Sequence, residues 1–213
     1  MNWLLRTLIS SIGKKQIMAV TGLGFCLFVA LHLIGNMTIY GGKDLFLSYV
    51  EHLHAWQWLV TLAEWGLVLL AVLHIATGLL LFLENLRARP VRYAVKKSAG
   101  GRTIGSATAP YTGILILCFI IVHLIKFRFV DKTNMNDFVI LSNTFTQWDW
   151  ALFYIIGVII VAVHVSHGFW SGLQTLGLNH PKYLPFIRRF GIVFSVVLGV
   201  GFASIPIFIL STI

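Results

Sequence analysis

Four histidines carry most of the chemistry that this sequence offers, because each lies in a different long apolar segment. They are His32, His74, His123 and His164, and the intervals between them are 42, 49 and 41 residues. Histidine is the commonest metal ligand, and a histidine inside a membrane is costly enough to indicate a functional site. One imidazole from each of four helices predicts two bis-histidine sites for haem iron, and so a protein that moves electrons through a bilayer.

Two other interpretations of the histidines stay open. Any one of them could be a core residue that hydrogen-bonds to a neighbouring helix. Histidine clusters also bind zinc, although two ligands at each of two levels do not form a tetrahedral site. The weaker candidates lie in predicted loops or lack a partner at their own level: His52, His54, His167 and His180.

The elements that position these side chains are predicted to be membrane-spanning helices. Of the 213 residues, 58% are hydrophobic and only 11% are charged, whereas a soluble domain has roughly 25% charged residues. The predicted fold class is all-α: one integral membrane domain over residues 1–213, with a four-helix bundle and a fifth helix. The five predicted spans cover residues 17–40, 56–83, 111–130, 150–173 and 190–213. A short helix that lies at the lipid headgroups or packs on a partner protein is predicted for residues 1–11. A loop is predicted for residues 88–109.

The charge balance favours a membrane and not a nucleic-acid partner. The net charge is +9, and the basic residues lie in short segments between apolar ones. Twelve of the 16 Lys and Arg residues fall on the side that holds the N-terminus, and four fall on the other side. By the positive-inside rule the N-terminus is cytoplasmic and the C-terminus is outside. The two cysteines are too few for the four thiolate ligands that an iron–sulfur cluster usually has.

Depth along the helices sorts the four histidines into two pairs. At about 1.5 Å per residue, His32 and His123 lie ~25 and ~20 Å above the cytoplasmic end, and His74 and His164 lie ~15 and ~12 Å above it. First and third helices are diagonal in an up-down bundle, as are second and fourth, so a haem plate fits between each pair. The two levels are expected to differ by roughly 5–10 Å.

Three glycines lie on the same helix faces as the histidines. Gly35 follows its histidine by three residues, and Gly78 and Gly168 follow theirs by four. A missing side chain at these positions gives a porphyrin room to approach. Close packing between helices is the competing explanation.

Three stretches of the chain are distinctive. Residues 11–23 read SIGKKQIMAVTGL, residues 32–36 read HLIGN, and residues 177–183 read GLNHPKY. They resemble the cytochrome b membrane-anchor subunit of succinate dehydrogenases and fumarate reductases, in the single-subunit, five-helix, dihaem class. The likeness covers nearly the whole chain in span count and histidine order.

The resemblance implies two haem b groups. Their ligands would be His32 with His123 at the outer, distal haem, and His74 with His164 at the inner, proximal haem. It also implies cytoplasmic partners in a bacterial inner membrane: a flavoprotein with FAD, where succinate and fumarate interconvert, and an iron–sulfur subunit. This chain would then carry electron transfer and quinone chemistry for the respiratory chain and the tricarboxylic acid cycle, with no dicarboxylate site.

The resemblance further implies a quinone site, usually for menaquinone, near the outer haem. The candidate proton carriers are Glu51, His52, His54 and Glu64. Two basic residues just beyond the third histidine could bind the outer haem propionates or extend to the headgroups, namely Lys126 and Arg128. Some family members carry a glutamate two residues before the fourth ligand as a proposed proton route, and Ala162 stands there in this chain.

Other classes of protein remain open alternatives. An ascorbate-linked transmembrane cytochrome shares the one-ligand-per-helix pattern, but it usually has six spans. The quinol-oxidising subunits of nitrate reductases and hydrogenases are also dihaem proteins, and some of them place two ligands on one helix. A haem-free transporter or structural anchor is the third class, and it would show no haem absorption.

Overall fold

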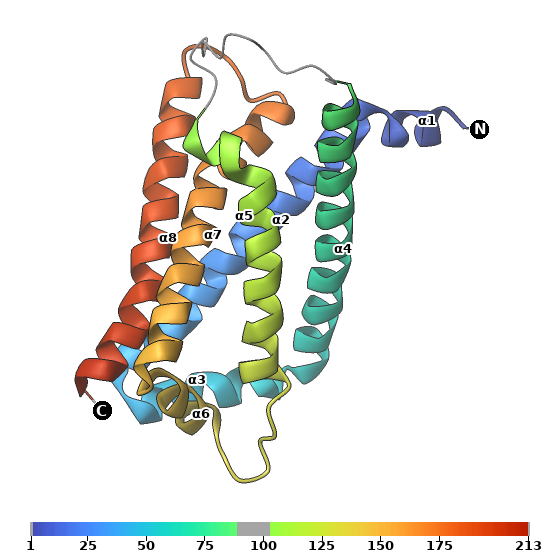
Figure 1. Cartoon of the computed structure of the whole chain (residues 1–213). Helices are drawn as coiled ribbons and strands as arrows, with labels where there is room; N and C mark the ends of the chain where they lie inside the picture. The colour runs from blue at the N-terminus through green and yellow to red at the C-terminus, as the bar shows by residue number, and fades with distance from the viewer. Residues whose placement is uncertain (1, 89–102, 213) are drawn as a thin grey trace.

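The computed structural model describes residues 2–88 and 103–212, and within these ranges every regular element is helical (Figure 1). The all-α prediction is therefore confirmed. The described residues include five helices long and apolar enough to cross a bilayer, as in a multi-pass membrane protein. In order, the elements are α1 (Trp3–Ile9), α2 (Ser11–Asn36), η1 (Met37–Gly41), α3 (Lys43–Ala55), α4 (Gln57–Arg87), α5 (Ile104–His123), η2 (Leu124–Arg128), α6 (Asp137–Phe145), α7 (Trp148–Thr175) and α8 (Leu184–Thr212).

Four long helices form the bundle, and the fifth packs against its side. Helix α2 packs against α4 and α7, and α5 packs against α7, whereas α4 and α5 make only slight contact. Helix α2 is therefore diagonal to α5, and α4 is diagonal to α7. Helix α8 lies along α7 and also contacts α2 (Figure 1).

Polar caps start the helices earlier than the apolar segments predict. The Ser10 side chain accepts a hydrogen bond from the Gly13 amide, and Thr103 and Ser106 form a capping box at the start of α5. Helix α5 therefore begins at Ile104 and includes Pro110, which corrects the predicted loop over residues 104–109. The rest of that predicted loop, residues 89–102, lies outside the described residues.

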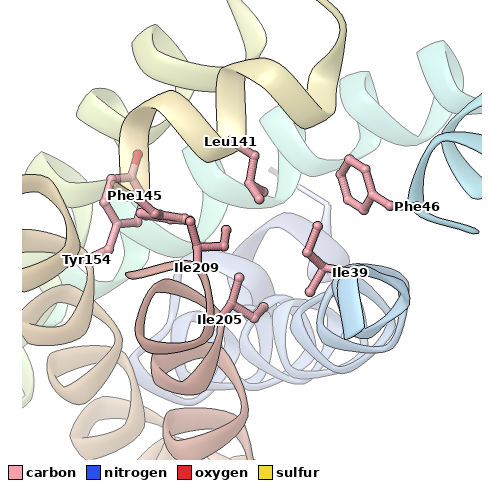
Figure 2. Packing of buried hydrophobic residues seen from close by; sticks show 7 residues of the cluster. All are labelled: Ile39, Phe46, Leu141, Phe145, Tyr154, Ile205 and Ile209. Carbon is pink, nitrogen blue, oxygen red and sulfur yellow. The ribbon is translucent and has the colours of Figure 1, made fainter. Parts of the chain in front are cut away.

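Two short helices close one end of the bundle, where the sequence predicted only loops. Helices α3 and α6 lie at the end that also holds the C-terminus of α8, here called the α3/α6 end (Figure 1). The buried residues that join them to η1, α7 and α8 are Ile39, Phe46, Leu141, Phe145, Tyr154, Ile205 and Ile209, here called the end cluster (Figure 2). The opposite end, which holds α1, is called the α1 end.

Candidate functional site

The four predicted histidines meet as two pairs across the bundle diagonals. The ring centroids of His32 on α2 and His123 at the end of α5 are 6.0 Å apart. Those of His74 on α4 and His164 on α7 are 6.4 Å apart. The ring planes are close to perpendicular in both cases, at 88° and 73°. We call the first the outer pair, which lies towards the α3/α6 end, and the second the inner pair, towards the α1 end.

The two levels are farther apart than the sequence predicts. Thr21 contacts the His74 ring and lies 11 residues before His32 on α2, so the levels differ by about 16 Å along that helix. On α7, Tyr154 contacts the His123 ring and lies 10 residues before His164, which corresponds to about 15 Å. The expected 5–10 Å was too small because α2 and α5 begin well before the apolar segments from which the depths were counted.

Two threonines hold the rings of the inner pair. The Thr21 Oγ1 lies 3.0 Å from His74 Nδ1, and the Thr112 Oγ1 lies 3.0 Å from His164 Nδ1. Each hydroxyl also donates to a carbonyl of its own helix, Thr21 to that of Ile17 at 2.7 Å and Thr112 to that of Thr108 at 3.1 Å. In the tautomer that carries its proton on Nδ1, each ring donates to the threonine oxygen, whose own proton is directed at the helix carbonyl. The lone pair of each ring is then on Nε2, where it can bind a metal.

The glycines that border the inner rings are not the ones that the sequence indicated. A Cβ at Gly22 would lie 3.1 Å from Cε1 of His74, and one at Gly113 would lie 3.7 Å from Cε1 of His164. By contrast, a Cβ at Gly35 would collide with Tyr49, and the Cβ positions at Gly78 and Gly168 have no histidine ring within 4 Å. At Gly35 the space is taken by Tyr49, whereas Gly78 and Gly168 keep the open space that was predicted for a porphyrin. Gly22 and Gly113 are, in addition, the glycines that border the inner rings.

Aromatic side chains surround the outer pair. Phe28 stacks on His32 with centroids 5.4 Å apart, and Phe202 lies 5.7 Å away. His123 contacts rings on α5, η2 and α7, namely Phe119, Phe127 and Tyr154. The one polar neighbour of the His32 ring is weak, the Asn36 amide at 3.5 Å from Nδ1. The two pairs thus have the same donors but different surroundings.

The donor chemistry of each pair suits haem. Within residues 2–88 and 103–212, no group of three or more His, Cys, Asp and Glu residues is placed to hold a metal ion. Each level therefore offers two imidazoles, which match the two axial positions of a haem iron whose other four ligands come from the porphyrin. A metal held at about 2 Å by one nitrogen of each ring puts the ring centres about 6 Å apart, and the observed centroid distances are 6.0 and 6.4 Å.

A hollow of about 630 Å³ lies between α3 and α4 near the outer pair's end of the bundle. Its walls are mostly apolar and aromatic: Tyr49, His52, Leu53, Trp56, Leu59, Val60 and Ala63. Of the predicted quinone-site residues only His52 lines this hollow. Glu51 and His54 are exposed on α3, and Glu64 follows the last lining residue on α4.

The remaining candidates have other partners. Arg128 donates two hydrogen bonds to the Glu64 carboxylate, from Nε at 2.7 Å and from an η nitrogen at 3.1 Å. Lys126 Nζ lies 3.8 Å above the Trp150 ring. Both basic residues belong to η2, a π-helical turn directly after His123. This turn joins the end of α5 to α4 through the Arg128–Glu64 ion pair, at the side of the bundle where these two helices otherwise barely meet.

His167, one turn after the inner ligand His164, faces no second histidine. Its ring lies edge-on to Trp170 with centroids 5.0 Å apart, and the Arg188 guanidinium covers the Trp170 ring at 4.4 Å. His167 therefore packs against Trp170 and stays the weaker ligand candidate that the sequence indicates.

The fold and these contacts define a class: an all-α membrane protein with five spans and two facing pairs of histidines at different depths. No family model, curated protein or solved structure matches the chain.

Proposed function

We propose that this chain is a dihaem cytochrome b that anchors a succinate:quinone oxidoreductase, either a succinate dehydrogenase or a fumarate reductase. The observation that carries the proposal is the meeting of four imidazoles from four helices in two pairs, with centroids 6.0 and 6.4 Å apart. In this proposal His74 and His164 bind the inner haem and His32 and His123 bind the outer haem. The haems supply one-electron redox chemistry, and the chain sets their positions and surroundings.

The resemblance of residues 11–23 and 177–183 to the anchor family supports the choice of complex. The first of these stretches forms the start of α2 and contains Thr21 and Gly22, which contact the inner histidine His74. The second lies between α7 and α8 at the α1 end. In the proposal, a flavoprotein and an iron–sulfur subunit dock at that end, and electrons pass between their clusters, the inner haem, the outer haem and a quinone.

The hollow between α3 and α4 supports a quinone site beside the outer pair. Ligand pockets are typically about 300–1,000 Å³ in volume, mostly apolar, and have a few polar groups that orient the ligand. Tyr49, Trp56 and His52 contribute aromatic faces to the apolar wall of the hollow. We propose menaquinone or another quinone as the occupant.

The distribution of basic residues supports the orientation. Of the basic residues that the structure describes, seven lie at the α1 end and four at the α3/α6 end. We therefore place the α1 end on the cytoplasmic side of a bacterial inner membrane, with the C-terminus outside. Succinate oxidation would then deliver electrons outward through the bundle, and fumarate reduction would draw them inward.

The test is the response of the haem in native membranes to different reductants. Succinate should give the sharp alpha and Soret bands of reduced bis-histidine haem, and a menaquinone analogue should then oxidise it. A complex that purifies with this chain should contain a flavoprotein and an iron–sulfur protein. If ascorbate, formate or hydrogen reduces the haem and succinate does not, the chain belongs to another class of dihaem cytochrome.

A further inference from the structure

Thr21 and Thr112 occupy equivalent places beside the two inner histidines. Thr21 on α2 contacts His74 on α4, and Thr112 on α5 contacts His164 on α7, both with 3.0 Å between hydroxyl oxygen and Nδ1. Each threonine is followed by a glycine, and each lies 11 residues before the outer ligand on its own helix. Because 11 residues are about three helical turns, the threonine and the outer histidine of each helix lie on the same helix face. The threonine–histidine contact between α2 and α4 is thus repeated between α5 and α7, and the two threonines are 91 residues apart.

We propose that Thr21 and Thr112 are positioning residues that fix the tautomer and ring orientation of the inner ligands and lower the reduction potential of the inner haem. The proposal rests on the proposed function, because it assumes that His74 and His164 bind haem iron. This role of the threonines is separate from ligation by the four histidines.

The physical reason is the direction of the hydrogen bonds. The hydroxyl proton of each threonine is directed at a carbonyl of its own helix, so in the tautomer with a proton on Nδ1 the ring donates to the threonine oxygen. A ligand imidazole whose second nitrogen donates to an acceptor becomes more basic and binds the metal in a fixed orientation. A more basic ligand stabilises ferric over ferrous iron, which lowers the potential.

The hydrogen-bond effect is expected at the inner haem and not at the outer haem. Thr21 is 3% exposed and Thr112 is 8% exposed, so a water molecule cannot readily replace the hydroxyl. Among the described residues no hydroxyl hydrogen-bonds to the outer rings: His32 has the weak Asn36 contact, and His123 packs against the rings of Phe119, Phe127 and Tyr154. Changes at the threonines should therefore leave the outer haem unaltered.

A competing arrangement is present in the same helices. The carbonyls of Met18 and Ala109, each three residues before a threonine, also approach the inner rings. If these carbonyls hold the rings by themselves, the hydroxyls are dispensable. The experiment must therefore remove the hydroxyl alone and leave the helix backbone intact.

The test uses the full-length chain with its haems and compares T21V and T112V with T21S and T77V. Valine replaces the hydroxyl with a methyl group of similar size, and serine keeps the hydroxyl. Thr77 is the matched control, because it is 7% exposed and lies one turn after His74, but its hydroxyl bonds the Leu73 carbonyl at 2.7 Å and not a ring. The readouts are a redox titration that resolves both haems and the EPR spectrum of each ferric haem.

We expect T21V and T112V to raise the midpoint potential of the inner haem and to change its EPR g-values, with the outer haem unchanged. T21S and T77V should match the parent protein. Loss of the inner haem in T21V alone, with T21S and T77V intact, also supports a ligand-holding hydroxyl. Unchanged inner-haem values in both valine variants, or an equal shift in T77V, would overturn the inference and leave the dihaem assignment standing. A parent protein without bis-histidine haem would instead overturn both.

Discussion

At the scale of single residues, the two histidine pairs differ in what touches them. Threonine hydroxyls hold the inner rings at 3.0 Å, whereas phenylalanine rings pack around the outer ones. Hydrogen bonding and solvent exclusion around the ligands are the main means by which a protein tunes a haem potential. Two sites with identical ligands in one chain are therefore expected to titrate at distinct potentials.

Gly22→Val should disturb the inner site specifically. A Cβ at this position would lie 3.1 Å from His74 Cε1, and valine adds two methyl groups there, so the ring must move. We expect inner-haem occupancy to fall by half or more while the outer haem is retained, measured as haem per polypeptide. The matched control is Gly66→Val on α4, where a Cβ meets nothing within 4 Å. Equal occupancy in the two variants would contradict the close fit at Gly22.

The sequence predicts the histidine ligands but not the side chains that hold them. Spacing in four apolar segments is enough to pair His32 with His123 and His74 with His164. A threonine in a membrane helix usually bonds a carbonyl of its own helix, as Thr21 does, so nothing in its type indicates a second partner. The dipeptide Thr-Gly stands 11 residues before both His32 and His123, so it repeats with the same 91-residue spacing as these two ligands. This recurrence could have indicated a role for the threonines near the haem ligands.

At the scale of helices, apolar runs locate the spans, and polar capping residues decide where the helices begin. Ser10 and Thr103 extend α2 and α5 beyond their apolar segments, which moved the outer histidines farther from the α1 end than expected. Helices α3 and α6 escaped prediction because they are short, and their apolar residues become buried only against η1, α7 and α8. Such contacts depend on tertiary structure and leave no long apolar run in the sequence.

Ile209→Ala should destabilise the α3/α6 end. Ile209 is 0% exposed in the end cluster, so its truncation removes packing among α6, α7 and α8 (Figure 2). We expect a loss of about 2 kcal/mol or more in the free energy of unfolding, measured by denaturant titration in detergent. The neighbouring Leu210→Ala is the control, since Leu210 is 44% exposed on the lipid side of the same helix. Its expected loss is within about 0.5 kcal/mol. A similar effect of the two substitutions would mean that the end cluster does not stabilise the fold.

At the scale of the whole molecule, the side of the bundle between α4 and α5 is joined mainly at one end. Helix α4 makes slight contact with α5, and the Arg128–Glu64 pair links the two at the α3/α6 end. At the other end the ion pair of Lys14 and Glu84 joins α2 to α4. The diagonal histidine pairs lie between these two polar links, and a haem at each level would add contacts between helices that pack little against each other.

Reporter fusions test the orientation on which the direction of electron flow depends. Alkaline phosphatase fused after Thr212 should be active, because the C-terminal end of α8 is expected outside the cell, and the same enzyme fused after Thr175 should be inactive. The reverse pattern would place the α1 end outside and would exclude docking of a cytoplasmic dehydrogenase there.

The most direct measurement of the central claim is the ratio of haem b to polypeptide in the purified chain, expressed with ample haem, together with the reduced-minus-oxidised spectrum. Two low-spin haems per chain are expected, and one in each of the variants His32→Ala, His74→Ala, His123→Ala and His164→Ala. A colourless parent chain, or two normal low-spin haems in any of the four variants, would contradict the assignment of these histidines as paired haem ligands.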